Sequence, residues 1–154
     1  MKRIFATALF ALLAYSCAAK GPVEIQLGHE KCTFCQMKIA DEKFHGQVRS
    51  EKGKYFHFDS IECLSAWRMK QADQHSQAWL RDYDSTRWLS SDAQIVQSTD
   101  VRSPMGLGLA AFASRSAAEE FIRANSGKIL SASDLDRLIA GWSINKVSEK
   151  IADR

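Results

Sequence analysis

The chain has 154 residues, of which 45% are hydrophobic and 25% are charged, and its formal net charge is +3. This composition is that of an ordinary globular protein, and the length predicts one compact domain or two small ones that share a core. The charge lacks the basic excess that marks nucleic-acid-binding proteins, so we exclude nucleic acid as a partner.

The first sixteen residues are predicted to be an export signal. Lys2 and Arg3 form a short basic region, and the apolar stretch from Ile4 to Leu13 follows. This stretch is too short to span a bilayer, which needs ~20 apolar residues. The residues around Cys17 resemble a bacterial lipoprotein cleavage site, so we expect residues 1–16 to be removed and Cys17 to be acylated. An ordinary cleaved signal with a spare cysteine is the alternative.

Removal of sixteen of the 154 residues, with Lys2 and Arg3 among them, would leave 138 residues and a formal charge of +1. Residues 17–27 would form a lipidated tether at the cell envelope, facing the periplasm or the cell surface. Ala18 carries no charge that would favour the inner membrane, so the outer membrane is the expected location. The folded part would keep an odd number of thiols, which does not suit a closed disulfide framework: Cys32, Cys35 and Cys63.

Residues 28–85 are predicted to form a first metal-binding unit of strands and one helix. Alternating apolar residues and turn signals predict strands over 35–40, 46–49, 54–58 and 78–83. Asp59 precedes Glu62 by three residues, which is the pattern of a capping box with Asp59 as the N-cap. The apolar spacing that follows predicts a helix that ends near Ala72.

Residues 86–145 are predicted to form a second unit with the same order of elements. Strands are predicted over 88–89, 93–96, 106–113 and 128–130. Ser116 and Glu119 form a second capping box, and the helix it opens should stop near Gly127. Ser131 to Asp134 caps a final helix. The predicted fold class is therefore α+β, with two linked ββαβ units.

The segment from Lys31 to Ile39 carries the main chemical signal, because it holds two thiols and a thioether within six residues. Soft sulfur ligands favour Cu(I), zinc or iron–sulfur chemistry over magnesium or calcium. The methionine in this segment, Met37, favours Cu(I) among these metals, since zinc gains little from a thioether whereas monovalent copper binds it well. On the predicted strand, Cys35 and Met37 leave the same face and could bind Cu(I) together. Met105 lies in a turn-forming segment rather than on a helix face, which makes it a further candidate ligand.

Two other interpretations of the cysteines stay open. A structural zinc site would use Cys32, Cys35, Cys63 and His57. A redox dithiol would use Cys32 and Cys35 alone, although the strand–helix context of a thioredoxin motif is absent. Cys63 falls in the first turn of the predicted helix, where the helix dipole favours a thiolate. His57 alternates with Asp59 on a strand, so the two side chains could face the same side.

The chain resembles the NosL family, exported copper-binding lipoproteins that assist maturation of nitrous oxide reductase. The resemblance covers roughly residues 28–140 and is carried by Cys35-Gln36-Met37, Phe44 to Val48, Phe58-Asp59, Met105-Gly106 and Ala111-Phe112. Family members usually have glycine where this chain has Gln36. The first half also resembles small metal-binding modules of the YHS and TRASH type.

The resemblance implies a Cu(I) chaperone whose fold is similar to that of the organomercurial lyase family. Cys35 and Met37 match the family's copper-binding motif, and Met105 matches its methionine in the second unit. Asp59 matches an acidic position, and Cys63 is an auxiliary candidate. The implied partner is nitrous oxide reductase or the membrane assembly complex that serves it.

We therefore expect an exported, membrane-anchored protein that takes up Cu(I) and passes it on by ligand exchange. No nucleophile motif such as Gly-x-Ser-x-Gly is present, so an enzyme is not expected. A second metal such as zinc is compatible with the same residues. The alternatives are a zinc-stabilised protein-binding module, an exported thiol-redox protein, and an organomercurial-lyase-like enzyme.

Overall fold

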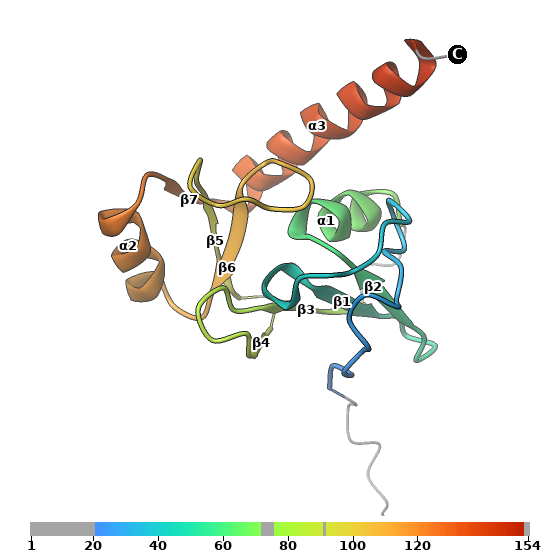
Figure 1. The fold of residues 1–154 in the computed structure, drawn as a ribbon, viewed down its shortest axis with the longest axis horizontal. Coiled ribbons are helices and arrows are strands. Elements are labelled where there is room, and N and C mark those ends of the chain that lie inside the picture. The colour runs from blue at the N-terminus through green and yellow to red at the C-terminus, as the bar shows by residue number, and fades with distance from the viewer. Residues whose placement is uncertain (1–20, 72–75, 91, 153–154) are drawn as a thin grey trace, which may run out of the picture.

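The computed structural model describes residues 21–71, 76–90 and 92–152, with side chains as far as Trp142. The predicted signal peptide, Cys17 and the first part of the predicted tether lie outside the described residues. Within the described part of the chain, no helix is both long enough and apolar enough to cross a membrane. Figure 1 shows helices packed on antiparallel strands, which confirms the predicted α+β class.

Two ββαβ units follow one another along the chain, as predicted. The first contains β1 (Gly46–Arg49), β2 (Tyr55–Phe58), α1 (Ile61–Met69) and β3 (Gln77–Arg81). The second contains β5 (Gln94–Gln97), β6 (Leu109–Phe112), α2 (Arg115–Ala124) and β7 (Lys128–Leu130). All strand pairs are antiparallel, and the two units share one strand order, β2-β1-β3 and β6-β5-β7. The repeat seen in the sequence pattern is therefore a repeat of topology.

The strand β4 (Trp88–Leu89) belongs to the first sheet, although the sequence pattern placed it in the second unit. It pairs with β3, where Leu89 lies opposite Leu80. A tight turn makes this pairing possible, because the backbone N–H of Asp82 donates to the carbonyl of Arg87 at 2.8 Å. The first sheet thus has the order β2-β1-β3-β4. The predicted division of the chain at residue 86 stays a prediction.

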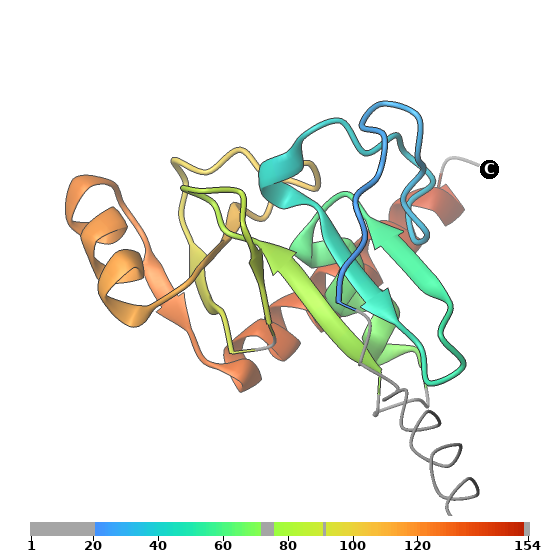
Figure 2. The ribbon, with the colours of Figure 1, turned by 90° about the horizontal axis from the view of Figure 1, so that it is seen from below.

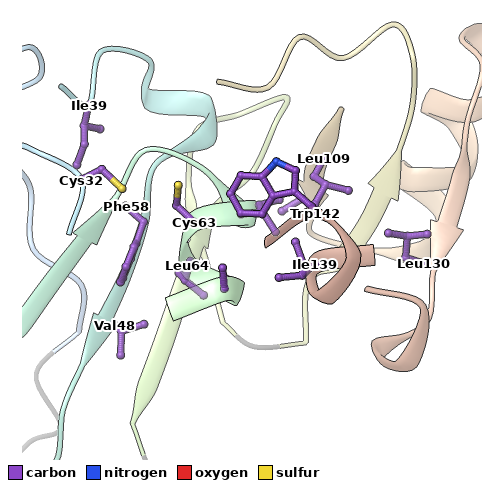
Figure 3. Close-up of a cluster of buried hydrophobic side chains, with 13 residues drawn as sticks. Cys32, Ile39, Val48, Phe58, Cys63, Leu64, Leu109, Leu130, Ile139 and Trp142 are labelled. Carbon is purple, nitrogen blue, oxygen red and sulfur yellow. The ribbon is translucent and has the colours of Figure 1, made fainter. Parts of the chain in front are cut away.

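The main core lies between the first sheet, α1 and α3 (Ala132–Ala152). Gly46 lets α1 approach the sheet closely, since a Cβ atom there would lie 2.7 Å from the side chain of Leu64. Ile139 and Trp142 of α3 are buried in the same cluster as Cys32 and Cys63 (Figure 3). A smaller cluster lies beneath α2, at the end of the molecule remote from β2 (Figures 1 and 2).

Three local predictions are wrong. Residues 35–40 do not form a strand: they lie in a turn and loop in which Lys31 and Lys38 form an isolated bridge. The N-cap of α1 is Ser60 rather than Asp59, because the Ser60 hydroxyl accepts the N–H of Cys63 at 3.2 Å. The N-cap of α2 is Ser114 rather than Ser116, for the same reason.

Candidate metal centre

Four side chains that metals can bind converge near the end of β2. The ligand atoms of Cys32, Cys35, Asp59 and Cys63 all lie within 4.8 Å of one another. Cys35 is half-buried and the other three are buried. They come from three places: the turn before β1, the residue after β2, and the first turn of α1. In Figure 3 the sulfur atoms of Cys32 and Cys63 point toward one another.

A tight turn presents Cys32 and Cys35. The N–H of Gln36 donates to the carbonyl of Cys32 at 3.0 Å, and the N–H of Cys32 donates to the carbonyl of Met37 at 2.8 Å. Gln36 has a φ of 67°, the left-handed conformation that glycine adopts most easily. Gln36 thus adopts a conformation in the turn that favours glycine.

The turn is attached to β2, which brings the cysteines to Asp59. The N–H of Thr33 donates to the carbonyl of His57 at 2.8 Å. Two residues further along the chain, the Cys35 thiol donates to Oδ2 of Asp59 at 3.2 Å. The other carboxylate oxygen, Oδ1, is buried and has no hydrogen-bond partner among the described residues. Because Ser60 caps the helix, Asp59 is available to the site.

Hydrogen bonding gives the three thiols different protonation behaviour. The pKa of Cys32 is lowered to about 6, chiefly because the Cys63 thiol donates to it and because backbone N–H groups, including those of Cys35 and Asp59, also point at its sulfur. The same contact raises the pKa of Cys63. Burial raises the pKa of Cys35 to about 12. At neutral pH the metal-free site therefore holds one thiolate, at Cys32, and two thiols.

The sequence-predicted ligands fall into two groups. Cys32, Cys35, Asp59 and Cys63 are brought together, whereas His57 is not a member of that four-residue group within the described chain. Met37 and Met105 stay predicted ligands. Met37 is 45% exposed, and since residues 35–40 are not a strand, it does not share a strand face with Cys35. Met105 is half-buried and packs against the core cluster that also contains Cys32 and Cys63.

One residue near the site was missed by sequence reasoning. Glu62 is fully buried and accepts hydrogen bonds from the Ser103 hydroxyl at 2.5 Å and from the N–H of Leu107 at 3.3 Å. These contacts hold the loop that carries Met105 against the first turn of α1. The position of Glu62, three residues after Asp59, predicts a capping role. No local sequence pattern predicts its hydrogen bond to Ser103.

The donor set is suited to soft metal ions. Three thiolate-forming sulfurs and one carboxylate can supply two or three sulfur ligands to Cu(I), or four ligands to zinc. The fold and the site together define a small α+β protein with a candidate soft-metal centre.

The chain belongs to the NosL family, whose sequence profile matches residues 22–139. The predicted resemblance is therefore confirmed. The chain is also similar to the crystal structure of the copper chaperone NosL from Shewanella denitrificans, with a TM-score of 0.60 and 19% sequence identity. That match covers 74% of this chain and 96% of the other, and at this identity it establishes a shared fold. A search of curated proteins found no match.

Proposed function

We propose that this protein is a Cu(I) carrier that binds its cargo at the cysteine cluster. The observation that carries the proposal is the convergence of three thiols and one carboxylate within 4.8 Å. Membership of the NosL family and the fold shared with a copper chaperone support copper as the metal. The sulfurs of Cys32 and Cys63 lie in the core, where a bound ion would be shielded from water and oxidants.

A gradient of exposure runs from the cluster to the surface and supports transfer by ligand exchange. Cys32 and Cys63 are fully buried, Cys35 is half-buried, and Met37 is 45% exposed. Cu(I) accepts two or three soft ligands, so an incoming ligand can add before another leaves. We infer that Cys35 is the ligand shared between the buried site and the surface, and that Met37 and Met105 are thioethers that assist entry and exit.

Metal binding can test this proposal directly. Protein purified under reducing, anaerobic conditions would be titrated with Cu(I) in competition with a chromophoric Cu(I) chelator. We expect the tightest equivalent to show sulfur ligands by X-ray absorption and to be lost when Cys32, Cys35 and Cys63 are all replaced by serine. Met37→Leu with Met105→Leu should mainly slow transfer to the chelator. An unchanged tight equivalent in the serine variant would overturn the proposal.

A structural zinc ion is the second candidate function for the same residues. Four donors, three of them buried, suit a closed tetrahedral zinc site. In that case the purified protein would carry zinc that Cu(I) does not displace. The zinc would survive loss of both methionines and would leave with Cys32→Ser and Cys63→Ser.

We further propose that Cys17 is acylated and holds the protein at the outer membrane, facing the periplasm or the cell surface. The lipoprotein-like sequence before Cys17 supports this. By family membership, the copper acceptor would be nitrous oxide reductase or its membrane assembly complex. Metabolic labelling with palmitate, lost in Cys17→Ser, tests the anchor. Copper content of the reductase in a strain that lacks this gene tests the client.

A further inference from the structure

The face of the first sheet opposite α1 is covered by the N-terminal segment, residues 21–24. Figure 2 shows this segment, in blue, crossing the near side of the sheet with α1 behind it. The N–H of Val23 donates to the side-chain oxygen of Gln47 at 2.9 Å, and the Gln47 amide donates back to the carbonyl of Val23. The indole N–H of Trp88 donates to Glu24 at 2.9 Å. The segment therefore closes a polar layer over this face.

Two histidines lie in that layer, and three of their ring nitrogens are buried without a hydrogen-bond partner among the described residues. His45 precedes β1 and is fully buried, and neither of its ring nitrogens has a hydrogen-bond partner among the residues described. His57, on β2, has a buried Nδ1 that likewise finds no partner in the described chain. The two ring centroids are 5.7 Å apart. Buried polar atoms without partners are rare in native proteins, and each one calls for an explanation.

Arg81 is the charged side chain beside His45, and its positive charge contributes, after burial, to lowering the pKa of His45. The guanidinium of Arg81 lies over the Trp88 ring, 3.9 Å from its centroid. It also pairs with two carboxylates, Glu24 and, at 3.1 Å, Glu42. The positive charge of Arg81 is thus countered by two carboxylates. Burial lowers the pKa of His45 to about 3, so its ring is neutral at physiological pH, and neutral imidazole is the form that binds metals.

We propose that His45 and His57 form a second metal site, ligated by nitrogen, for one Cu(I) ion. Metal–nitrogen bonds of ~2 Å place the centroids of two imidazoles on one ion at most ~6 Å apart, which the observed separation fits. A two-coordinate geometry suits Cu(I), whereas zinc in proteins takes four ligands. The site goes beyond the cysteine cluster and does not depend on it.

The second site is linked to the first through the backbone of β2. His57 and Asp59 are two residues apart, and the carbonyl of His57 accepts the N–H of Thr33, next to Cys32. An ion at the histidines would therefore lie on the segment that supports the sulfur cluster. The protein would hold a second, nitrogen-bound ion in addition to the sulfur-bound one.

The experiment separates the two sites by removing the sulfur ligands. In the variant with Cys32, Cys35 and Cys63 replaced by serine, anaerobic Cu(I) titration should still find one equivalent. Adding His57→Gln should abolish that equivalent, and adding His29→Gln, at an exposed histidine, should leave it. Absence of binding in the variant without Cys32, Cys35 and Cys63, or equal effects of the two histidine changes, would overturn the proposal.

A second readout uses the unaltered protein, in case the triple serine variant does not fold. Ag(I), a monovalent mimic of Cu(I), would be added to two equivalents while the imidazole nitrogens are followed by long-range proton–nitrogen NMR. We expect large shifts of the His45 and His57 ring nitrogens and none for His29. Unmoved resonances of His45 and His57 would overturn the proposal. If Ag(I) binds at the histidines but not at the cysteines, the proposed carrier function of the cysteine cluster is contradicted and the histidine site is not.

Discussion

Glu62 in the first turn of α1 accepts a hydrogen bond from the hydroxyl of Ser103, 41 residues away, at 2.5 Å. The same hydroxyl accepts the N–H of Gly108 at 2.9 Å, so Ser103 links the carboxylate to the loop backbone. Through this contact the residue next to Cys63 holds the loop that contains Met105. The two units of the fold are thus joined beside the candidate metal centre.

Ser103→Ala should therefore destabilise the protein, because it removes the hydroxyl donor of a buried carboxyl group. Hydrogen bonds to charged groups contribute ~1.5–3 kcal/mol, and we expect a loss in that range in urea unfolding. Ser90→Ala is a matched control, since Ser90 makes its hydrogen bond to a carboxylate, that of Asp92, at an exposed position. Its effect should stay within ~0.5 kcal/mol. Equal losses in both variants would show that the Glu62 contact has no special role.

The metal-free, reduced protein should contain one thiolate at neutral pH. The pKa of Cys32 is lowered to about 6 from the ordinary 9.0 by the Cys63 thiol and by backbone N–H donors. A pH titration followed by the ultraviolet absorbance of thiolates should show one step near pH 6. Cys32→Ser should remove that step, and Cys63→Ala, which removes the side-chain donor, should move it to higher pH. A wild-type titration without ionisation below the ordinary range would contradict this assignment.

Acid should destabilise the metal-free protein through His45. Burial lowers the pKa of His45 from 6.5 to about 3. Between these pH values the unfolded chain binds a proton at His45 that the folded protein does not bind. The free energy of unfolding should then fall as the pH drops from about 6.5 to about 3, with a contribution on the order of 5 kcal/mol. His45→Phe should flatten this part of the pH profile, and His29→Gln should not. Parallel profiles for wild type and His45→Phe would refute the prediction.

Replacing Gln36 by glycine should stabilise the protein. Its φ of 67° costs a residue with a side chain ~1–2 kcal/mol, part of which is offset by the greater freedom of glycine in the unfolded chain. We expect a net gain of ~0.5–1 kcal/mol in chemical denaturation, with Cu(I) affinity unchanged. Gln26→Gly, at an exposed glutamine outside the left-handed region, should bring no gain. A loss of stability on Gln36→Gly would mean that the Gln36 side chain matters more than its backbone.

Most elements of the fold could be read from local patterns. β1 and β7 have the predicted bounds, and α1 begins where its capping signal predicts to within one residue. Such features depend on turn residues and side-chain alternation over a few neighbouring positions. The strand predicted over 35–40 is wrong because two apolar residues in alternation also occur in a turn. Gln36 in the left-handed conformation breaks the extended backbone there.

The candidate metal centre was predictable in its parts but not in its assembly. Cysteine spacing alone joins Cys32 to Cys35. Cys63 and Asp59 join them only because the turn is bonded to β2 and Ser60, not Asp59, caps α1. Asp59 and Ser60 are adjacent, and either side chain could cap α1. In the structure Ser60 is the cap, and Asp59 instead accepts a hydrogen bond from Cys35, 24 residues away.

Read alone, the amino acids specify an α+β chain of two similar halves with soft sulfur ligands and predict its export, since these properties depend on composition and short-range order. Folding in three dimensions selects which ligands meet, places Met37 at the surface, and buries His45 beside His57 under residues distant in the chain. The reason is that burial and pairing across strands are set by contacts between remote segments, and their energies outweigh the weak preferences of each residue for its neighbours.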